Sequence, residues 1–267
     1  MTDIQTQITD IEKEIRETPY NKSTERHHGI LRAKISKFKG LLEDKVSKKS
    51  GGGVGYAVKK QGDATIVLVG PPSSGKSTLI NKLTNANSKI APYAFTTVTV
   101  IPGMMTYKDA KIQILDVPGL IEGAEIGKGR GREVLSVVRG SDLLIIMTDA
   151  DRLGALKSIT DSLELAGIRI NKMPPKVRVE KKLKGGIQIF SNVRQDLDRQ
   201  TVIEVAKEFR IVNAEIAIKE KLTIEQLIDS FAKNRVYVPA LYIVNKSDLD
   251  VAAPLANYFD ESIHRSN

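Results

Sequence analysis

The chain lacks cysteine altogether, and it lacks long apolar runs. Without cysteine there are no disulfides and no thiolate metal ligands, which suits a reducing compartment. No apolar stretch approaches the ~18 residues that a membrane-spanning helix needs. The first residues, MTDIQTQITDIEKEI, are polar and acidic, so they do not form a signal peptide. We therefore predict a cytoplasmic protein that does not contact membranes.

Histidine is also scarce. The chain has three, His27, His28 and His264, and none shows the spacing with carboxylates that is typical of a metal site. We expect all three to be ordinary surface side chains. A histidine-based metal centre is therefore not part of the predicted function.

Positive charge, in contrast, is plentiful and unevenly distributed, within a net charge of +9. Residues 1–62 hold 13 basic and 8 acidic side chains, a net of +5, and residues 167–238 hold 15 and 9, a net of +6. Residues 63–166 hold 11 of each sign, and residues 239–267 hold 2 basic and 4 acidic side chains. A basic excess often does no more than solubilise a surface. Its concentration in two segments favours a polyanionic partner such as RNA.

The N-terminal segment predicts two helices. Isoleucines recur at helical spacing over residues 3–17, Thr18-Pro19 breaks the pattern, and a second amphipathic stretch covers about 24–49. We predict a helical hairpin domain, resembling a helix-turn-helix, over residues 1–50. The glycine-rich stretch at 51–62 follows no strand, so we interpret it as a linker rather than a phosphate loop.

From residue 63 the sequence alternates between strands and helices. Buried strands are predicted at 64–70, 111–119, 142–150 and 239–248, with helices after residue 75 and at 130–139 and 155–167. Such alternation specifies an α/β fold with a mainly parallel sheet and helices on both faces. We assign it to residues 63–166, continued by residues 239–267.

Residues 167–238 interrupt this alternation with a basic α+β module. Residues 176–191 predict a hairpin that turns at Gly185-Gly186. They are followed by a helix at 198–210, a strand at 214–220 and a helix at 223–234 that Thr223 caps. We therefore predict a module inserted between two parts of the sheet domain.

The stretch GPPSSGKST predicts a phosphate-binding loop. It fits the pattern Gly-x4-Gly-Lys-Ser directly after a strand and at the start of a helix, which is the context that makes this pattern specific. Backbone N–H groups of such a loop and of the helix N-terminus face phosphate oxygens. Lys76 would reach the β- and γ-phosphates, and the Ser77 hydroxyl would bind Mg²⁺. The predicted nucleotide-binding residues of the loop are Gly70, Ser73, Ser74, Gly75, Lys76, Ser77 and Thr78.

Two further motifs indicate which nucleotide the loop binds. In DVPG, Asp116 ends a strand where its carboxylate would lie beside the metal, and the N–H of Gly119 would sense a γ-phosphate. A turn or capping role for Asp116 is the alternative. In NKSD, Asp248 offers two carboxylate oxygens to the two N–H donors of guanine, Asn245 would contact the base and brace the loop, and Lys246 would lie over the ring. After a sheet strand and downstream of a phosphate loop, this motif predicts GTP or GDP rather than ATP.

Together these stretches resemble the developmentally regulated GTP-binding (DRG) proteins, an Obg-related family of P-loop GTPases, over essentially the whole chain. The resemblance includes TPYNKSTERHHGILRAKI, GGGVGYAVKKQGDATIVLVG, FTTVTVIPG and LDVPGLIEGAEIGKGRGREVLSVVR. It identifies the chain as a member, and an archaeal one. It implies that the inserted module is S5D2-like, that Thr97 binds Mg²⁺ as a switch residue, and that hydrolysis is slow. It further implies association with ribosomes or RNA and a dedicated stabilising partner protein. The catalytic set is then Lys76, Thr97 and Gly119, and the metal ligands are Ser77, Thr97 and Asp116.

Two features depart from related GTPases. Leu120 follows DVPG where Ras-like enzymes have a water-orienting glutamine. A bound monovalent cation such as K⁺ is one hypothesis for replacing it, although some potassium-activated GTPases have Asn where this chain has Ser73. Family members also continue past NKxD to a further guanine-contacting loop and a TGS domain, which LDVAAPLANYFDESIHRSN does not reach, so we expect an incomplete second part.

The predicted function is therefore a slow GTPase acting as a ribosome- or RNA-associated switch in translation. The alternative is a guanine-nucleotide-dependent adaptor that binds RNA or ribosomes without useful hydrolysis.

Overall fold

The structure, a computed structural model, describes residues 3–49, 61–84, 91–92, 99–117 and 131–246. The chain forms two compact units. We call Met1–Gly53 with Met173–Arg235 the basic unit, and Val54–Lys172 with Val236–Asn267 the sheet unit. Within the described part, no helix is both long enough and apolar enough to cross a membrane.

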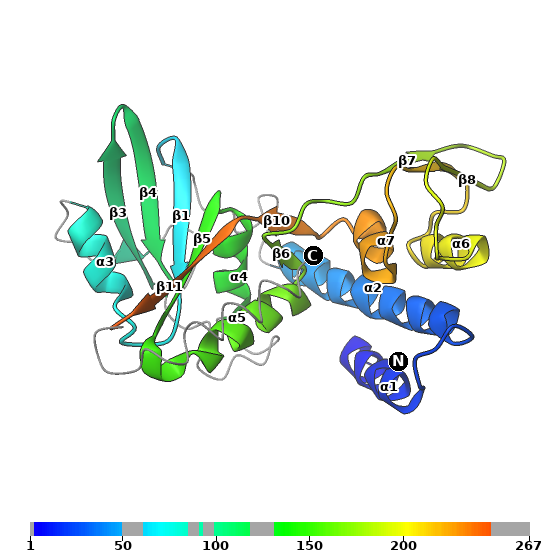
Figure 1. Cartoon of the computed structure of the whole chain (residues 1–267), viewed down its shortest axis with the longest axis horizontal. Helices are drawn as coiled ribbons and strands as arrows, with labels where there is room; N and C mark the ends of the chain where they lie inside the picture. Colours follow the sequence, from blue (N-terminus) through cyan, green and yellow to red (C-terminus); the bar gives the residue numbers. More distant parts are fainter. Residues whose placement is uncertain (1–2, 50–60, 85–90, 93–98, 118–130, 247–267) are drawn as a thin grey trace. The chain divides into compact units, whose positions relative to one another are not determined.

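The sheet unit is built on six strands in the order β11-β5-β1-β4-β3-β2 (Figure 1). The strands β11, β5, β1 and β4 are parallel, whereas β3 runs antiparallel to β4 and β2 antiparallel to β3. The strands are β1 (Ala64–Val69), β2 (Ala91–Pro92), β3 (Thr99–Tyr107), β4 (Ala110–Asp116), β5 (Leu143–Asp149) and β11 (Ala240–Asn245). The predicted α/β fold is confirmed, with an antiparallel edge added to the parallel sheet.

Helices cover both faces of this sheet because its central strands are apolar on both sides. Val67 and Val69 of β1 pack into a core with α4 (Gly131–Arg139) and α5 (Gly154–Leu165). Leu68, between them in sequence, packs into a separate core with Ile80 of α3 (Lys76–Leu83). Alternation along one strand therefore places α3 on one face and α4 and α5 on the other.

A two-stranded parallel sheet, which the sequence pattern did not indicate, completes the described sheet unit. It pairs β6 (Ile168–Ile170) with β10 (Val236–Val238). The Asn171 side chain donates to Ala240 O at 3.0 Å and accepts from Ala240 N at 2.7 Å. These contacts fix the start of β11, the strand that leads into NKSD.

The basic unit combines the N-terminal helices with the inserted module, whereas the sequence pattern predicts two separate domains. α2 packs on α6 and α7, and Ala33 of α2 lies in the same core as Val205 and Leu227. Ion pairs Arg26–Glu204 (3.0 Å) and Arg32–Glu225 join the two segments. Its elements are α1 (Ile4–Glu17), α2 (Glu25–Lys49), β7 (Val177–Lys181), β8 (Ile187–Ser191), α6 (Arg199–Glu208), β9 (Ala214–Ile218) and α7 (Ile224–Phe231).

The predicted hairpin over residues 176–191 is wrong. The two strands form, but the sheet order is β7-β9-β8, with β9 antiparallel to β7 and parallel to β8. Gly185 and Gly186 do make a turn, at φ of 107° and 72°. However, β9 has Ala214, Ile216 and Ile218 buried along one face and therefore takes the centre of the sheet. A turn signal is local, whereas strand pairing is decided by tertiary burial.

The prediction that all three histidines lie at the surface is wrong for His28. This side chain is buried, its Nε2 lies 3.0 Å from Thr18 O, and its ring meets Tyr20 edge to face. His27 is exposed and its Nε2 lies 2.9 Å from Glu14 Oε1. His264 lies outside the described residues.

Candidate nucleotide-binding site

The loop between β1 and α3 has the backbone that the glycine pattern predicts. Gly75 caps the N-terminus of α3 at φ 98°, and Ser73 also has a positive φ of 60°. A Cβ on Gly75 would lie 2.2 Å from Asn245 Nδ2, and one on Gly70 would lie 2.0 Å from Met147 O. Gly70 requires glycine because the backbone of β5 lies too close for a side chain, and Gly75 requires it because its φ is left-handed.

Lys76 turns back over this loop. Its side chain is buried, and Nζ donates to Gly70 O at 3.0 Å and to Pro71 O at 2.7 Å. Burial lowers the pKa of Lys76, and the nearby Asp116 carboxylate partly opposes that shift. Because both acceptors are neutral carbonyl groups, the Lys76 ammonium group can still bind a more negative group.

Ser77 and Asp116 meet beside Lys76. The Ser77 hydroxyl donates to Asp116 Oδ2 at 2.8 Å, and Asp116 lies next to Leu68 of β1 in parallel register. The other carboxylate oxygen, Oδ1, is buried with no hydrogen-bond partner within the described part of the chain. A hydroxyl and a carboxylate are the hard oxygen ligands that Mg²⁺ prefers, so these two residues fit such an ion.

Asn245 and Lys246 contact the same loop from the end of β11. Asn245 Nδ2 donates to Ser74 O at 3.0 Å, and Lys246 Nζ donates to Ser73 O at 3.2 Å. Lys246 has a φ of 56°, so the backbone turns as it leaves the strand. The first half of NKSD therefore adjoins the phosphate-loop motif, although some 170 residues separate them in sequence.

Not every predicted site residue can be placed. Thr97, Gly119 and Asp248 lie outside the described residues, as does Leu120. Thr78 lies in the first turn of α3 and is exposed. The predicted residues that the structure brings together are Gly70, Ser73, Ser74, Gly75, Lys76, Ser77, Asp116, Asn245 and Lys246.

Comparison with known proteins gives two family matches. Residues 65–182 match the model described as 50S ribosome-binding GTPase, and residues 184–263 match the C-terminal region of that domain family. Developmentally-regulated GTP-binding protein 1 homolog of Dictyostelium discoideum is 43% identical over 270 residues, covering 96% of this chain and 73% of that protein. Developmentally-regulated G-protein 3 of Arabidopsis thaliana is 44% identical over 274 residues, covering 99% and 74%.

The chain belongs to the DRG family. Its sheet unit has the fold of a P-loop GTPase domain. The GTP-binding protein MJ1326 of Methanocaldococcus jannaschii is 49% identical over 247 residues, which cover 92% of this DRG chain but 63% of MJ1326. The chain thus spans somewhat less than two thirds of that relative.

Two residues of this DRG protein that lie next to the loop, Arg152 and Asp149, were not predicted from the sequence. Arg152 Nη2 donates to Pro72 O of the loop at 2.9 Å and also contacts the buried Asp149 carboxylate. The Arg152 guanidinium, through its hydrogen bonds, holds the pKa of Asp149 below its ordinary value despite burial. The sequence feature that could have indicated them is Asp149 itself, an acidic residue at the carboxyl end of the buried strand β5, where ligands of open α/β sheets bind.

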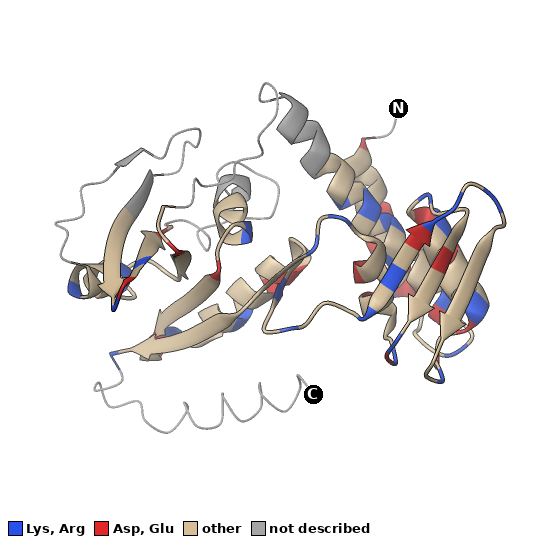
Figure 2. Ribbon diagram, turned by 90° about the horizontal axis from the view of Figure 1, so that it is seen from above, with Lys and Arg blue, Asp and Glu red and all other residues tan. Residues whose placement is uncertain are grey.

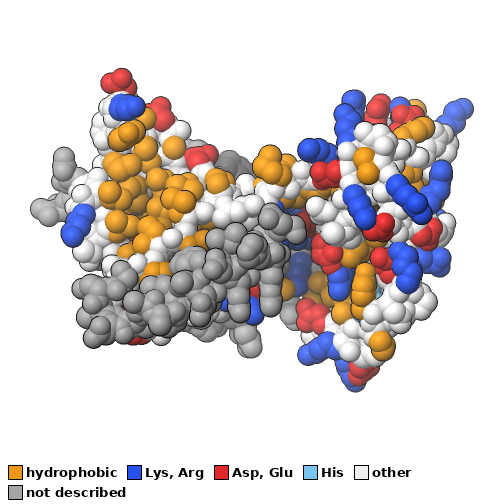
Figure 3. Space-filling view, in the orientation of Figure 1, with side chains coloured by type: hydrophobic (Ala, Val, Ile, Leu, Met, Phe, Trp, Pro, Cys, Tyr) orange, Lys and Arg blue, Asp and Glu red, His pale blue; other side chains and the backbone are white. Residues whose placement is uncertain are grey.

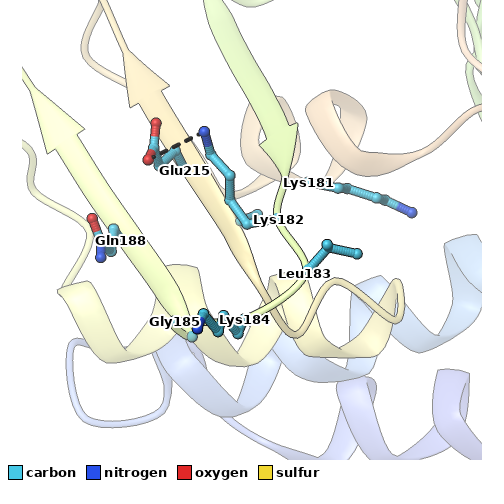
Figure 4. A pocket seen from close by; sticks show the side chains of 9 residues that line it. Lys181, Lys182, Leu183, Lys184, Gly185, Gln188 and Glu215 are labelled. Carbon is cyan, nitrogen blue, oxygen red and sulfur yellow. Dashed lines mark ion pairs between the residues drawn. The ribbon is translucent and has the colours of Figure 1, made fainter.

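The basic unit has a hollow of its own, of about 440 Å³, beside the loop between β7 and β8. Lys182 turns toward Glu215 across it (3.4 Å), while Lys181 points the other way (Figure 4). Its lining residues are Lys181, Lys182, Leu183, Lys184, Gly185, Gly186, Gln188, Ala214 and Glu215. Lys182 and Lys184 of the loop, with Lys181 at the end of β7, make this edge of the module a candidate for contact with anions.

Proposed function

We propose that this DRG protein binds GTP and GDP with Mg²⁺ and hydrolyses GTP slowly as a molecular switch. The observation that supports this most is the Ser77–Asp116 contact beside Lys76, with the second Asp116 oxygen buried and unpartnered within the described residues. Mg²⁺ held by Ser77 and Asp116 would neutralise charge on the phosphates. Lys76 would then exchange its two carbonyl acceptors for phosphate oxygens.

The remaining roles fall on residues outside the described part. Thr97 would add its hydroxyl to the metal, the Gly119 N–H would sense the γ-phosphate, and Asp248 would select guanine. With Leu120 after DVPG, water has no glutamine to orient it, so catalysis would depend on positioning and electrostatics. A K⁺ ion near Ser73 would be an added source of positive charge.

Single-turnover hydrolysis of GTP tests the switch. We expect slow, Mg²⁺-dependent release of phosphate that Lys76→Ala abolishes, and faster turnover in K⁺ than in Na⁺ if a monovalent cation takes part. Equal rates in the two salts would dismiss the cation. Retained GDP binding without detectable hydrolysis would instead favour the nucleotide-dependent adaptor, for which Leu120 is the motivating residue.

We further propose that the basic unit associates with RNA or ribosomes during translation, with a stabilising partner protein. It holds 24 Lys and Arg against 17 Asp and Glu, a net of +7, while the sheet unit holds 17 against 15, a net of +2. Charged residues are interspersed over the basic unit, whereas the strands of the sheet unit are mostly uncharged (Figure 2). On the face seen in Figure 3, lysine and arginine side chains project widely from the basic unit.

Binding to RNA as a function of salt tests this second proposal. The double variant Lys181→Glu/Lys184→Glu should weaken RNA binding about tenfold and flatten its salt dependence, because counterion release scales with phosphate contacts. Lys111→Glu/Lys157→Glu, an equal change of charge at exposed lysines of the sheet unit, is the matched control. Equal effects of the two variants would show that net charge, not the basic unit, attracts RNA.

A further inference from the structure

Five successive carbonyl groups of the phosphate loop are bound by side chains. This is unusual for a loop, whose carbonyls ordinarily face water. Peptide N–H and C=O groups point in nearly opposite directions, so holding Pro72 O and Ser74 O outward keeps the N–H groups of Ser73 and Gly75 turned to the inside. Gly70 O and Pro71 O precede prolines, which have no N–H. The donors are Lys76 for Gly70 O and Pro71 O, Arg152 for Pro72 O, Lys246 for Ser73 O and Asn245 for Ser74 O.

Arg152 is the donor that belongs to none of the nucleotide motifs. It ends a short 3-10 helix, η1 (Ala150–Arg152), directly after β5. Its Nε lies 2.9 Å and 3.2 Å from the two oxygens of Asp149, and its Nη2 lies 2.5 Å from Oδ2. The Thr148 hydroxyl donates to Arg152 O at 2.9 Å, which holds the backbone of this turn as well. The guanidinium is therefore fixed in orientation before it reaches Pro72 O.

Asp149 connects Arg152 to the guanine-recognition motif. Its side chain is 6% exposed, and Oδ2 also lies 3.7 Å from Lys246 Nζ. Asp149 and Asn245 are register partners at the ends of β5 and β11. One buried carboxylate thus lies between two cations, Arg152 and Lys246, each of which donates to an adjacent carbonyl of the loop. Without it, two like charges would face each other at this edge of the sheet.

We propose that Arg152 and Asp149 are positioning residues that hold the phosphate loop in its phosphate-binding conformation and connect it to the Asn245-Lys246 turn. The proposal rests on the phosphate-binding role proposed above for this loop. Neither residue touches the nucleotide in this scheme. Arg152 acts through the carbonyl of Pro72, and Asp149 acts through Arg152 and Lys246. The pair therefore contributes to the affinity for the phosphates, and less to the affinity for the base.

Affinities for GDP and GMP separate this role from a general structural one. The loop encloses the β-phosphate, which GMP lacks. Arg152→Gln is expected to weaken GDP binding about tenfold or more while GMP binding changes less than about twofold. Arg152→Lys should lose less GDP affinity than Arg152→Gln, because lysine keeps the positive charge but not the bidentate guanidinium group. Arg139→Gln is the matched control, since Arg139 also donates to a backbone carbonyl, that of Ala166, in the same unit.

Asp149→Asn tests the connection. It should reproduce the loss seen with Arg152→Gln, and the double variant should lose little more, because the two residues act together. Wild-type GDP binding is measured in the same series: its absence would refute the proposed function itself. Normal wild-type binding with unchanged GDP affinity in Arg152→Gln would overturn the positioning role. Equal losses for GDP and GMP, with a lowered melting temperature, would also overturn it in favour of a purely structural pair.

Discussion

The two units of the molecule place their buried polar groups differently. Of eight buried polar or charged side chains described in the sheet unit, five lie at the carboxyl ends of β1, β4 and β5: Ser74, Lys76, Asp116, Thr148 and Asp149. In the basic unit the buried polar side chains are spread over three helices, and Ser36 and Asp229 both contact Arg235 (2.7 and 2.5 Å). The basic unit uses its buried polar groups to join its own segments.

This difference indicates in which unit a substitution should change ligand binding and in which it should change only stability. A cluster of buried, incompletely paired groups is costly unless something binds there. The sheet unit concentrates that cost at one edge, next to the loop, whereas in the basic unit the buried Ser36 and Asp229 both bond Arg235. Changes at the loop should therefore affect nucleotide binding strongly, and changes that remove a helix cap or a buried contact in the basic unit should affect local stability without affecting nucleotide binding.

The largest effect is expected for Gly75→Ala. An alanine at φ 98° is strained, and its Cβ would lie 2.2 Å from Asn245 Nδ2, so the Asn245 amide that bonds Ser74 O must also move. We expect GDP affinity to fall by about a hundredfold, equivalent to about 3 kcal/mol, in titration calorimetry. Gly154→Ala is the matched control, since a Cβ there meets no atom within 4 Å. Wild-type affinity in Gly75→Ala would contradict the role of this close approach.

The phosphate loop was predictable because its chemistry is local. Glycines at fixed spacing, a strand before and a helix after are all contained in some fifteen residues, and they specify the backbone between Gly70 and Lys76. The placement of Asp116 and Asn245 followed from a further rule, that strand ends of a parallel sheet meet at one edge. Both the fold of the sheet unit and most of the described site could thus be obtained from sequence.

What sequence did not provide depends on tertiary contacts. Residues 176–191 have two strands and a glycine turn, and only the burial of β9 reveals that these strands never pair. In the sequence, His28 is one polar residue among many in a lysine-rich helix, and only the structure shows that Thr18 and Tyr20 contact it. Arg152 follows no motif, because its partner Pro72 is 80 residues away. Pairwise contacts at such distances leave no periodic signal in a single sequence.

A smaller effect, and one that depends on pH, is expected for Asp149→Asn. Hydrogen bonds from Arg152, with further attraction from Arg152 and Lys246, lower the folded-state pKa of Asp149 against the opposing effect of burial. Its ionised form therefore stabilises the fold fully above its unfolded pKa, and that stabilisation is lost as pH falls through the lower folded-state value. At pH 7 we expect Asp149→Asn to reduce the free energy of unfolding by about 2 kcal/mol.

Urea unfolding of both proteins from pH 7 down to about 3, around the acidic range of a carboxyl group, measures this difference. The gap between wild type and Asp149→Asn should narrow as the carboxylate becomes protonated. A gap that stays constant across this range would show that the substituted amide differs from the carboxylate by shape and hydrogen bonding rather than by charge. The same curves should show little change in the unfolding of the basic unit.

The smallest effect is expected in the basic unit, for Thr223→Ala. Thr223 Oγ1 accepts from Gln226 N (3.3 Å) while Gln226 Oε1 accepts from Thr223 N (2.9 Å), a reciprocal cap at the start of α7. Losing it should cost about 1 kcal/mol, seen as faster amide hydrogen exchange along α7. Ser230→Ala, which removes a hydroxyl that bonds Gln226 O on the same helix, should be nearly neutral. GDP affinity should be unchanged in both variants. If Thr223→Ala also weakened GDP binding, the two units would be energetically coupled, and the stability of the inserted module would itself be part of the switch.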